Sequence, residues 1–104
     1  MLAHAVYFTL LDPSPRNLTA AVAACRELLS GHAGMLHFSA GTRGAEFARP
    51  VNDRDFDVAL LTIFTDKDAH DRYQTHPRHV AFVETNKALW KQVRVFDAWM
   101  EALP

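Results

Sequence analysis

The sequence predicts an α+β domain whose secondary-structure elements follow the order β-α-β-β-α-β. Residues 2–11 alternate in the manner of a strand, and residues 15–29 have an apolar stripe at helical spacing. Two further apolar runs lie on either side of a loop at residues 44–55. Pro77 then divides the last helical region, because proline ends one helix and favours the start of another. We take the chain as one domain, residues 1–104.

The first predicted strand covers residues 2–11, where successive side chains fall on two faces. Neither face is polar. We assign one face to the side that the helices cover. It consists of His4, Val6, Phe8 and Leu10, and the opposite face consists of Ala3, Ala5, Tyr7 and Thr9.

The first helix is predicted to begin after Ser14, a good N-cap, with Pro15 at its first position. Gly31 is a suitable residue for its C-terminal end. Its apolar stripe consists of Leu18, Val22, Cys25 and Leu29.

The second strand is expected at residues 35–42, with Leu36, Phe38 and Ala40 on one face. The third is expected at residues 56–64 and is apolar on both faces. Residues 65–68 resemble a capping box that begins a short helix through Tyr73. A helix from Pro77 to about Trp90 and a strand at residues 93–100 complete the chain. This order is typical of a ferredoxin-like sandwich, an antiparallel sheet with helices on one face.

The uncovered face of such a sheet is too apolar here to remain in water. Burying it against the same face of a second copy is the simplest solution, since closed symmetric pairs are the commonest oligomers. We therefore expect a homodimer in which two sheets face each other as a dimeric α+β barrel. The residues concerned are Ala5, Tyr7, Leu61, Ile63, Phe96 and Ala98.

Composition excludes several classes of partner. The formal net charge is −1 and the basic residues are scattered, which argues against nucleic acid and against an acidic membrane surface. No apolar run approaches transmembrane length, and the N-terminal run lacks the features of a signal peptide. A single cysteine, Cys25, cannot form an internal disulfide, which fits a reducing compartment. We expect a cytoplasmic protein.

The segment from Tyr73 to Phe82 is the most informative for chemistry. Pro77 makes His76 the cap between two helices and places His79 in the first turn of the second. A helix N-terminus disfavours a further positive charge, so His79 is biased towards the neutral imidazole that can accept a proton. His79 is therefore the best candidate in the chain for a general base.

The chain resembles the stress-responsive A/B barrel (Dabb) family of dimeric α+β barrels. The resemblance extends from His4-Ala5-Val6 to Val95-Phe96-Asp97. Its most specific part is Asp57-x-Ala59-Leu60-x-x-x-Phe64-x-Asp66 followed by Tyr73-x-x-His76-Pro77-x-His79-x-x-Phe82. The resemblance implies a ferredoxin-like protomer and a homodimer, but it does not by itself imply a reaction.

One branch of that family, the plant olivetolic acid cyclase, closes the ring of a linear polyketide without a metal or an organic cofactor. The positions of its site that match here are His4, Tyr73 and His79. The cyclase also has a tyrosine in its first helix. That place falls near Cys25, and this chain has no tyrosine between Tyr7 and Tyr73.

Ring closure of this kind needs a base that removes a proton next to a carbonyl and a donor that stabilises the oxyanion. His79 is the candidate base and Tyr73 the candidate donor, while His4 is an orienting partner or a further donor. Each also has a structural interpretation. The His-Pro-x-His segment can be a helix cap, Tyr73 a buried ring, and His4 a satisfied sheet histidine.

Two other functions remain open from sequence, a non-enzymatic stress or assembly protein and a monooxygenase or isomerase on a similar barrel. We expect no metal and no cofactor, because no two histidines have the i, i+4 spacing with an intervening glutamate and no cysteine accompanies them. The expected partners are a second copy of the chain and a small apolar or carbonyl-containing ligand.

Overall fold

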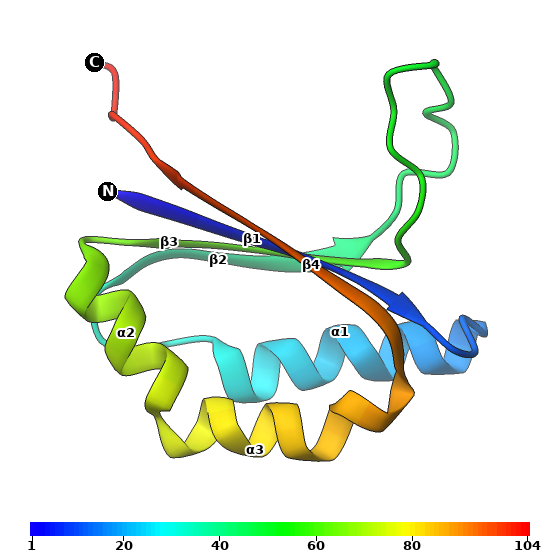
Figure 1. Cartoon of the computed structure of the whole chain (residues 1–104), viewed down its shortest axis with the longest axis horizontal. Coiled ribbons are helices and arrows are strands. Elements are labelled where there is room, and N and C mark those ends of the chain that lie inside the picture. The colour runs from blue at the N-terminus through cyan, green and yellow to red at the C-terminus, as the bar shows by residue number, and fades with distance from the viewer.

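The computed structural model describes residues 1–104 and places a four-stranded antiparallel sheet on a single layer of helices (Figure 1). The strands lie in the order β2-β3-β1-β4. This confirms the ferredoxin-like α+β fold that the sequence predicts. The elements are β1 (Leu2–Leu10), α1 (Pro15–Leu29), β2 (Met35–Thr42), β3 (Val58–Phe64), α2 (Lys67–Thr75), α3 (Pro77–Asn86), the short 3-10 helix η1 (Lys87–Leu89) and β4 (Trp90–Trp99).

The hydrophobic core lies between the sheet and the helices. Side chains of β1 and β3 that point towards the helices are at most 6% exposed. They include His4, which confirms its assignment to the helix side. Cys25 and Leu29 of the α1 stripe complete this layer and are each 1% exposed.

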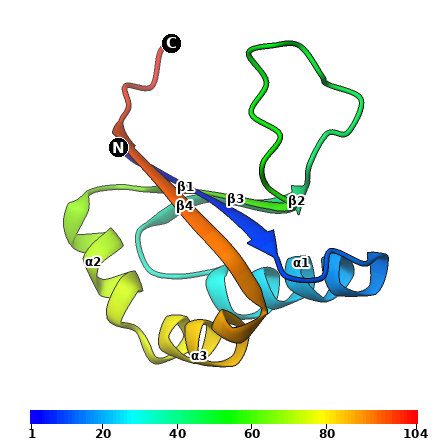
Figure 2. The same ribbon diagram turned by 45° about the vertical axis from the view of Figure 1, so that its right-hand side comes forward.

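The opposite face of the sheet has no helix against it. In Figures 1 and 2 the three helices lie on one side, while the loop between β2 and β3 and the C-terminal tail rise on the other. We call this side the open face. Strand register places its residues in cross-strand rows, namely Ile63-Ala3-Ala98, Leu61-Ala5-Phe96 and Ala59-Tyr7-Arg94.

The helix starts follow from local capping. The Ser14 hydroxyl accepts the backbone N–H of Asn17 at 3.3 Å, as the sequence predicts for α1. At α2 the cap is Asp66, whose carboxylate accepts the N–H of Ala69 at 2.8 Å. The cap therefore lies one residue later than the predicted capping box. No helix in the structure combines the length and the apolar character needed to cross a membrane.

The predicted end of the last helix is wrong. Helix α3 ends at Asn86, and Trp90 begins β4 instead of closing the helix. The Asn86 amide donates to the Phe82 carbonyl at 2.8 Å, while Leu11 N–H donates to the Leu89 carbonyl at 3.0 Å. Pairing with β1 therefore begins earlier than helical periodicity alone suggests. Strand β4 accordingly starts three residues before the predicted Val93.

Strand β2 has the predicted bounds but not the predicted face. An irregularity in its pairing with β3 falls between Met35 and His37. Met35, Phe38 and Ala40 pack against the core, whereas Leu36 is 58% exposed. The bulge removes Leu36 from the face that it was expected to share with Phe38.

Candidate active site

A cavity of about 150 Å³ lies between the sheet and the helices, beneath β4. Most of its lining is apolar, and its polar side chains come from β1, α2 and α3. These include all three of the candidate site residues His4, Tyr73 and His79. The rest of the lining is formed by Val6, Phe8, Leu29, Leu60, Gln74, Phe82, Val83, Trp90, Val93 and Val95.

A larger hollow of about 390 Å³ lies on the open face, between Tyr7, Phe56 and Phe96. Its charged residues are already engaged with each other, because the Arg94 guanidinium donates to both carboxylate oxygens of Asp53 at 2.6 and 3.1 Å. This hollow offers no base or nucleophile. The smaller cavity is therefore the candidate site.

The break between α2 and α3 at Pro77 brings the side chains of Tyr73 and His79 together. The Nδ1 atom of His76 accepts the backbone N–H of Arg78 at 3.1 Å, so His76 caps α3. The structural interpretation is therefore correct for His76. The chain turns here, and Tyr73 near the end of α2 meets His79 in the first turn of α3. Their ring centroids are 4.7 Å apart in an edge-to-face arrangement.

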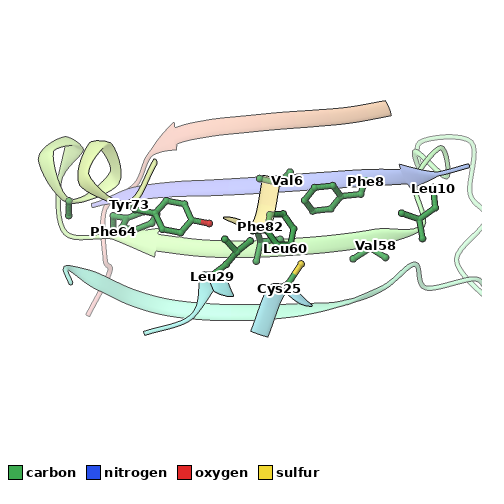
Figure 3. Packing of buried hydrophobic residues seen from close by; sticks show 11 residues of the cluster. Val6, Phe8, Leu10, Cys25, Leu29, Val58, Leu60, Phe64, Tyr73 and Phe82 are labelled. Carbon is green, nitrogen blue, oxygen red and sulfur yellow. The ribbon is translucent and has the colours of Figure 1, made fainter. Parts of the chain in front are cut away.

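Tyr73 is 2% exposed as a residue, and its hydroxyl borders the cavity without a hydrogen-bond partner in the protein. Figure 3 shows the ring beside Phe64, with the hydroxyl directed towards Leu29, Leu60 and Phe82. Burial raises the pKa of Tyr73 well above its ordinary value. The phenol therefore keeps its proton at neutral pH and can donate it in a hydrogen bond to a ligand.

His79 is half-buried in the wall of the same cavity. Burial lowers the pKa of His79 below its ordinary value of 6.5, and the neighbouring His4, His32 and His70 lower it further. The imidazole is therefore neutral at pH 7. This agrees with the expectation from its place at a helix start, although burial is the larger cause.

His4 is held by Asp97, which lies directly opposite it on β4. The Nδ1 atom of His4 is 2.5 Å from a carboxylate oxygen of Asp97. Burial lowers the pKa of His4 and outweighs the opposing effect of Asp97. Because Nδ1 is engaged with the carboxylate, the imidazole has a fixed orientation in the cavity wall.

Sequence reasoning missed three residues around this site. Asp97 comes from β4, His70 from α2, and His32 from the turn after α1. The ring of His70 lies 4.7 Å from that of His4, and the ring of His32 lies 4.9 Å from that of Tyr73. Asp97 could have been identified only from the register of β1 and β4, which places Asp97 opposite His4.

Cys25 lies on the apolar stripe of α1. It is 1% exposed, and burial raises the pKa of its thiol to about 11. Cys25 is therefore a packing residue and not a nucleophile.

Comparison with solved structures supports the fold. A Dabb family protein from Mesorhizobium loti with a ferredoxin-like fold is 25% identical, covers 97% of each chain and has a TM-score of 0.78. A dimeric ferredoxin-like protein of unknown function from Thermobifida fusca is 16% identical over 95% of this chain and 90% of its own, with a TM-score of 0.79. The hydroxynitrile lyase of Passiflora edulis is 18% identical over 99% and 96%, with a TM-score of 0.74.

A search of curated protein sequences finds no match. The family model described as the stress responsive A/B barrel domain, Dabb, matches residues 2–100. That range includes every strand and helix of the structure together with all the residues of the candidate site. The chain therefore belongs to the stress-responsive A/B barrel domain family.

Proposed function

We propose that the protein is a homodimer in which each protomer binds a small carbonyl compound and performs proton-transfer chemistry on it, of the lyase or cyclase type. The observation that supports this most strongly is the Tyr73 hydroxyl. It is a donor at the cavity wall without a protein partner, next to a neutral imidazole in an apolar cavity. A ligand oxygen in the cavity would give this hydroxyl the hydrogen bond that the protein does not supply.

The volume of the cavity limits the ligand. A cavity of about 150 Å³ in a protein core accommodates a molecule the size of benzene. Aldehydes, ketones or hydroxynitriles with one ring fit this volume, whereas a long polyketide does not. The apolar lining favours the ring, and the Tyr73 hydroxyl and the His79 imidazole favour an oxygen at the end near Tyr73.

His79 and Tyr73 have complementary parts in this chemistry. On a hydroxynitrile, the unprotonated nitrogen of His79 takes the hydroxyl proton, the C–C bond to the nitrile breaks, and cyanide leaves with the bonding pair. The new carbonyl oxygen accepts a hydrogen bond from Tyr73. On a ketone, His79 removes the proton next to the carbonyl, and Tyr73 stabilises the enolate oxygen. The hydroxynitrile lyase of Passiflora edulis, a neighbour in fold, supports the first reaction.

The apolar residues of the open face are the reason for proposing a homodimer. Leu61 and Phe96 lie in the middle row of this face and are 39% and 55% exposed. A contiguous apolar surface of this kind marks an interaction site. The dimeric ferredoxin-like neighbour from Thermobifida fusca supports a second copy of the chain as the partner.

Two assays test the chemistry in buffer that contains EDTA. One follows benzaldehyde release from mandelonitrile, and the other follows deuterium incorporation into cyclohexanone in D₂O. We expect turnover above that of free imidazole, and a fall of at least about a hundredfold in His79→Ala, because a positioned base contributes roughly that much. His37→Ala is the matched control, since His37 is exposed on β2, hydrogen-bonds to Ser39 and does not line the cavity.

Circular dichroism and urea unfolding accompany each variant. If His79→Ala loses stability and activity together, the structural interpretation of His79 is correct and the proposal fails. If the wild-type protein neither turns over nor binds either probe, a non-enzymatic stress or assembly role replaces it.

A further inference from the structure

Three side chains that lie far apart in the sequence meet at one end of β1. His4 comes from β1, His70 from α2 and Asp97 from β4. Each offers one ligand atom, a ring nitrogen or a carboxylate oxygen, and these atoms lie within 4.8 Å of one another. The fold brings them together through strand register, which pairs His4 with Asp97, and through the Asp66 cap, which fixes the start of α2.

We propose that His4, His70 and Asp97 bind one divalent transition-metal ion of the zinc class. Two imidazoles and one carboxylate form the donor set of open zinc sites, in which water takes the fourth position. The absence of a thiolate argues against copper(I), and the two nitrogen donors argue against magnesium and calcium. The proposal differs from the expectation of no metal, because the sequence spacing of these residues gives no sign of their proximity.

The distances are compatible with a small rearrangement of side chains. Ligand atoms around tetrahedral zinc lie about 3.3 Å apart, given metal–ligand bonds of about 2.0–2.2 Å. The pair formed by His4 and Asp97 is closer than this, at 2.5 Å, and the cluster as a whole spans up to 4.8 Å. The ion takes the place of the proton shared by His4 and Asp97, and His70 moves inward by about 1 Å or more to complete the site.

His70 has the hydrogen-bond partner that a metal ligand needs. Its Nδ1 atom is 3.2 Å from a carboxylate oxygen of Asp71. An N–H donated there leaves the lone pair on Nε2 for the ion, which is the carboxylate–histidine–metal arrangement of zinc proteins. The present contact of Nε2 is a long one, 3.3 Å to the Gln74 amide, and it is readily exchanged for a metal bond.

Exposure provides a path for the ion and for water. The Asp97 side chain is 47% exposed, whereas those of His4 and His70 are 5% and 16% exposed. The ion would therefore have protein on the His4 side and solvent on the Asp97 side. His70 and Asp97 do not line the cavity of Tyr73 and His79. His4 belongs to both groups, but the proposed chemistry needs no ion, so the two proposals can be tested apart in the presence and absence of EDTA.

The test uses tag-free protein that has been stripped with EDTA and dialysed. Zn²⁺ is titrated by calorimetry, and Co²⁺ is titrated by visible absorption, which reports coordination by nitrogen. We expect one ion per chain. His70→Phe keeps the ring that packs on Phe64 and should weaken Zn²⁺ binding more than about tenfold, while Asp71→Asn should weaken it by about tenfold.

His37→Ala is the control, because it removes an exposed histidine of β2, which is not a member of the cluster, and should leave binding unchanged. The proposal is overturned if the wild-type protein shows no saturable binding, or if His70→Phe binds as tightly as His37→Ala does. Its failure leaves the His79 assays untouched, since those are run in EDTA.

Discussion

The two faces of the sheet are built from the same strands but differ in what they leave unsatisfied. The covered face is closed by helices. Its buried polar residues His4 and Thr62 are hydrogen-bonded, but the Tyr73 hydroxyl at the cavity has no protein partner. The open face is apolar and uncovered, with Leu61 and Phe96 at its centre. One face therefore lacks a hydrogen-bonding ligand, and the other lacks a packing partner. Chemistry and assembly are thus expected on opposite sides of one sheet, where mutations can separate them.

The largest expected effect is on assembly. Leu61→Lys places a charge in the centre of the open face, and in the proposed homodimer it does so twice. An unpaired buried charge costs about 3–5 kcal/mol, so we expect the dissociation constant to rise more than about a hundredfold. Sedimentation velocity over a range of protein concentrations measures this change.

Val80→Lys is the matched control for that experiment. Val80 lies on α3, on the covered side, and is 48% exposed, so the same charge there remains in water. Its sedimentation should equal that of the wild-type protein. Dimers of undiminished affinity in Leu61→Lys would refute the assignment of the open face as the interface.

A second comparison makes the same substitution on each face. Phe64 is fully buried between the sheet and α2, so Phe64→Ala should cost about 3–5 kcal/mol of unfolding free energy at any protein concentration. Phe96 is 55% exposed on the open face, so Phe96→Ala should act mainly through dimer dissociation. Urea unfolding at two protein concentrations distinguishes them. If Phe96→Ala lowers the unfolding free energy by the same amount at both protein concentrations, Phe96 does not act through the dimer.

Sequence patterns predicted the fold where the determinants are local. Ser14, Pro15 and Pro77 act on their immediate neighbours, and the alternation of β1 defines its buried face without reference to other strands. The errors arose where pairing with a neighbouring strand determines the face or the start of a strand. The bulge at Leu36 depends on pairing with β3, and the start of β4 at Trp90 depends on pairing with β1.

The candidate site also has one part that local sequence predicts and one part that depends on tertiary contacts. Tyr73 and His79 could be brought together from sequence because a single proline turn separates them. The contacts of His4 with Asp97 and His70 bridge 93 and 66 positions, and no local rule predicts them. The cluster of His4, His70 and Asp97 therefore depends on how distant segments of the chain pack together.

Tyr73→Phe tests the covered face without disturbing its packing. The substitution removes a hydroxyl that has no protein partner, so we expect the unfolding free energy to change by less than about 1 kcal/mol. Mandelonitrile cleavage should nevertheless fall at least about tenfold, because the oxyanion donor is lost. A loss of 2 kcal/mol or more, roughly the cost of a broken buried hydrogen bond, would instead show that the hydroxyl has a structural role.

The smallest expected effect concerns pH. Burial lowers the pKa of His32 below 6.5, although its ring contacts the Leu28 carbonyl at 3.0 Å, and Arg78 and His76 lower the pKa further. Tyr73, edge-on to the ring, is uncharged at these pH values. The unfolded chain therefore binds a proton at a higher pH than the folded chain does, and stability falls as the pH drops below about 6.5.

His32→Gln keeps a donor for the Leu28 carbonyl but cannot titrate. The slope of unfolding free energy between about pH 7 and pH 5 should therefore be shallower in the variant, by at most about 1.4 kcal/mol per pH unit for one proton. Part of the slope should remain, because burial also lowers the pKa values of His4 and His79. Equal slopes in urea titrations of the two proteins would show that His32 titrates alike in the folded and unfolded states. The acid sensitivity would then come from the cavity histidines alone, which places it at the site of the proposed chemistry.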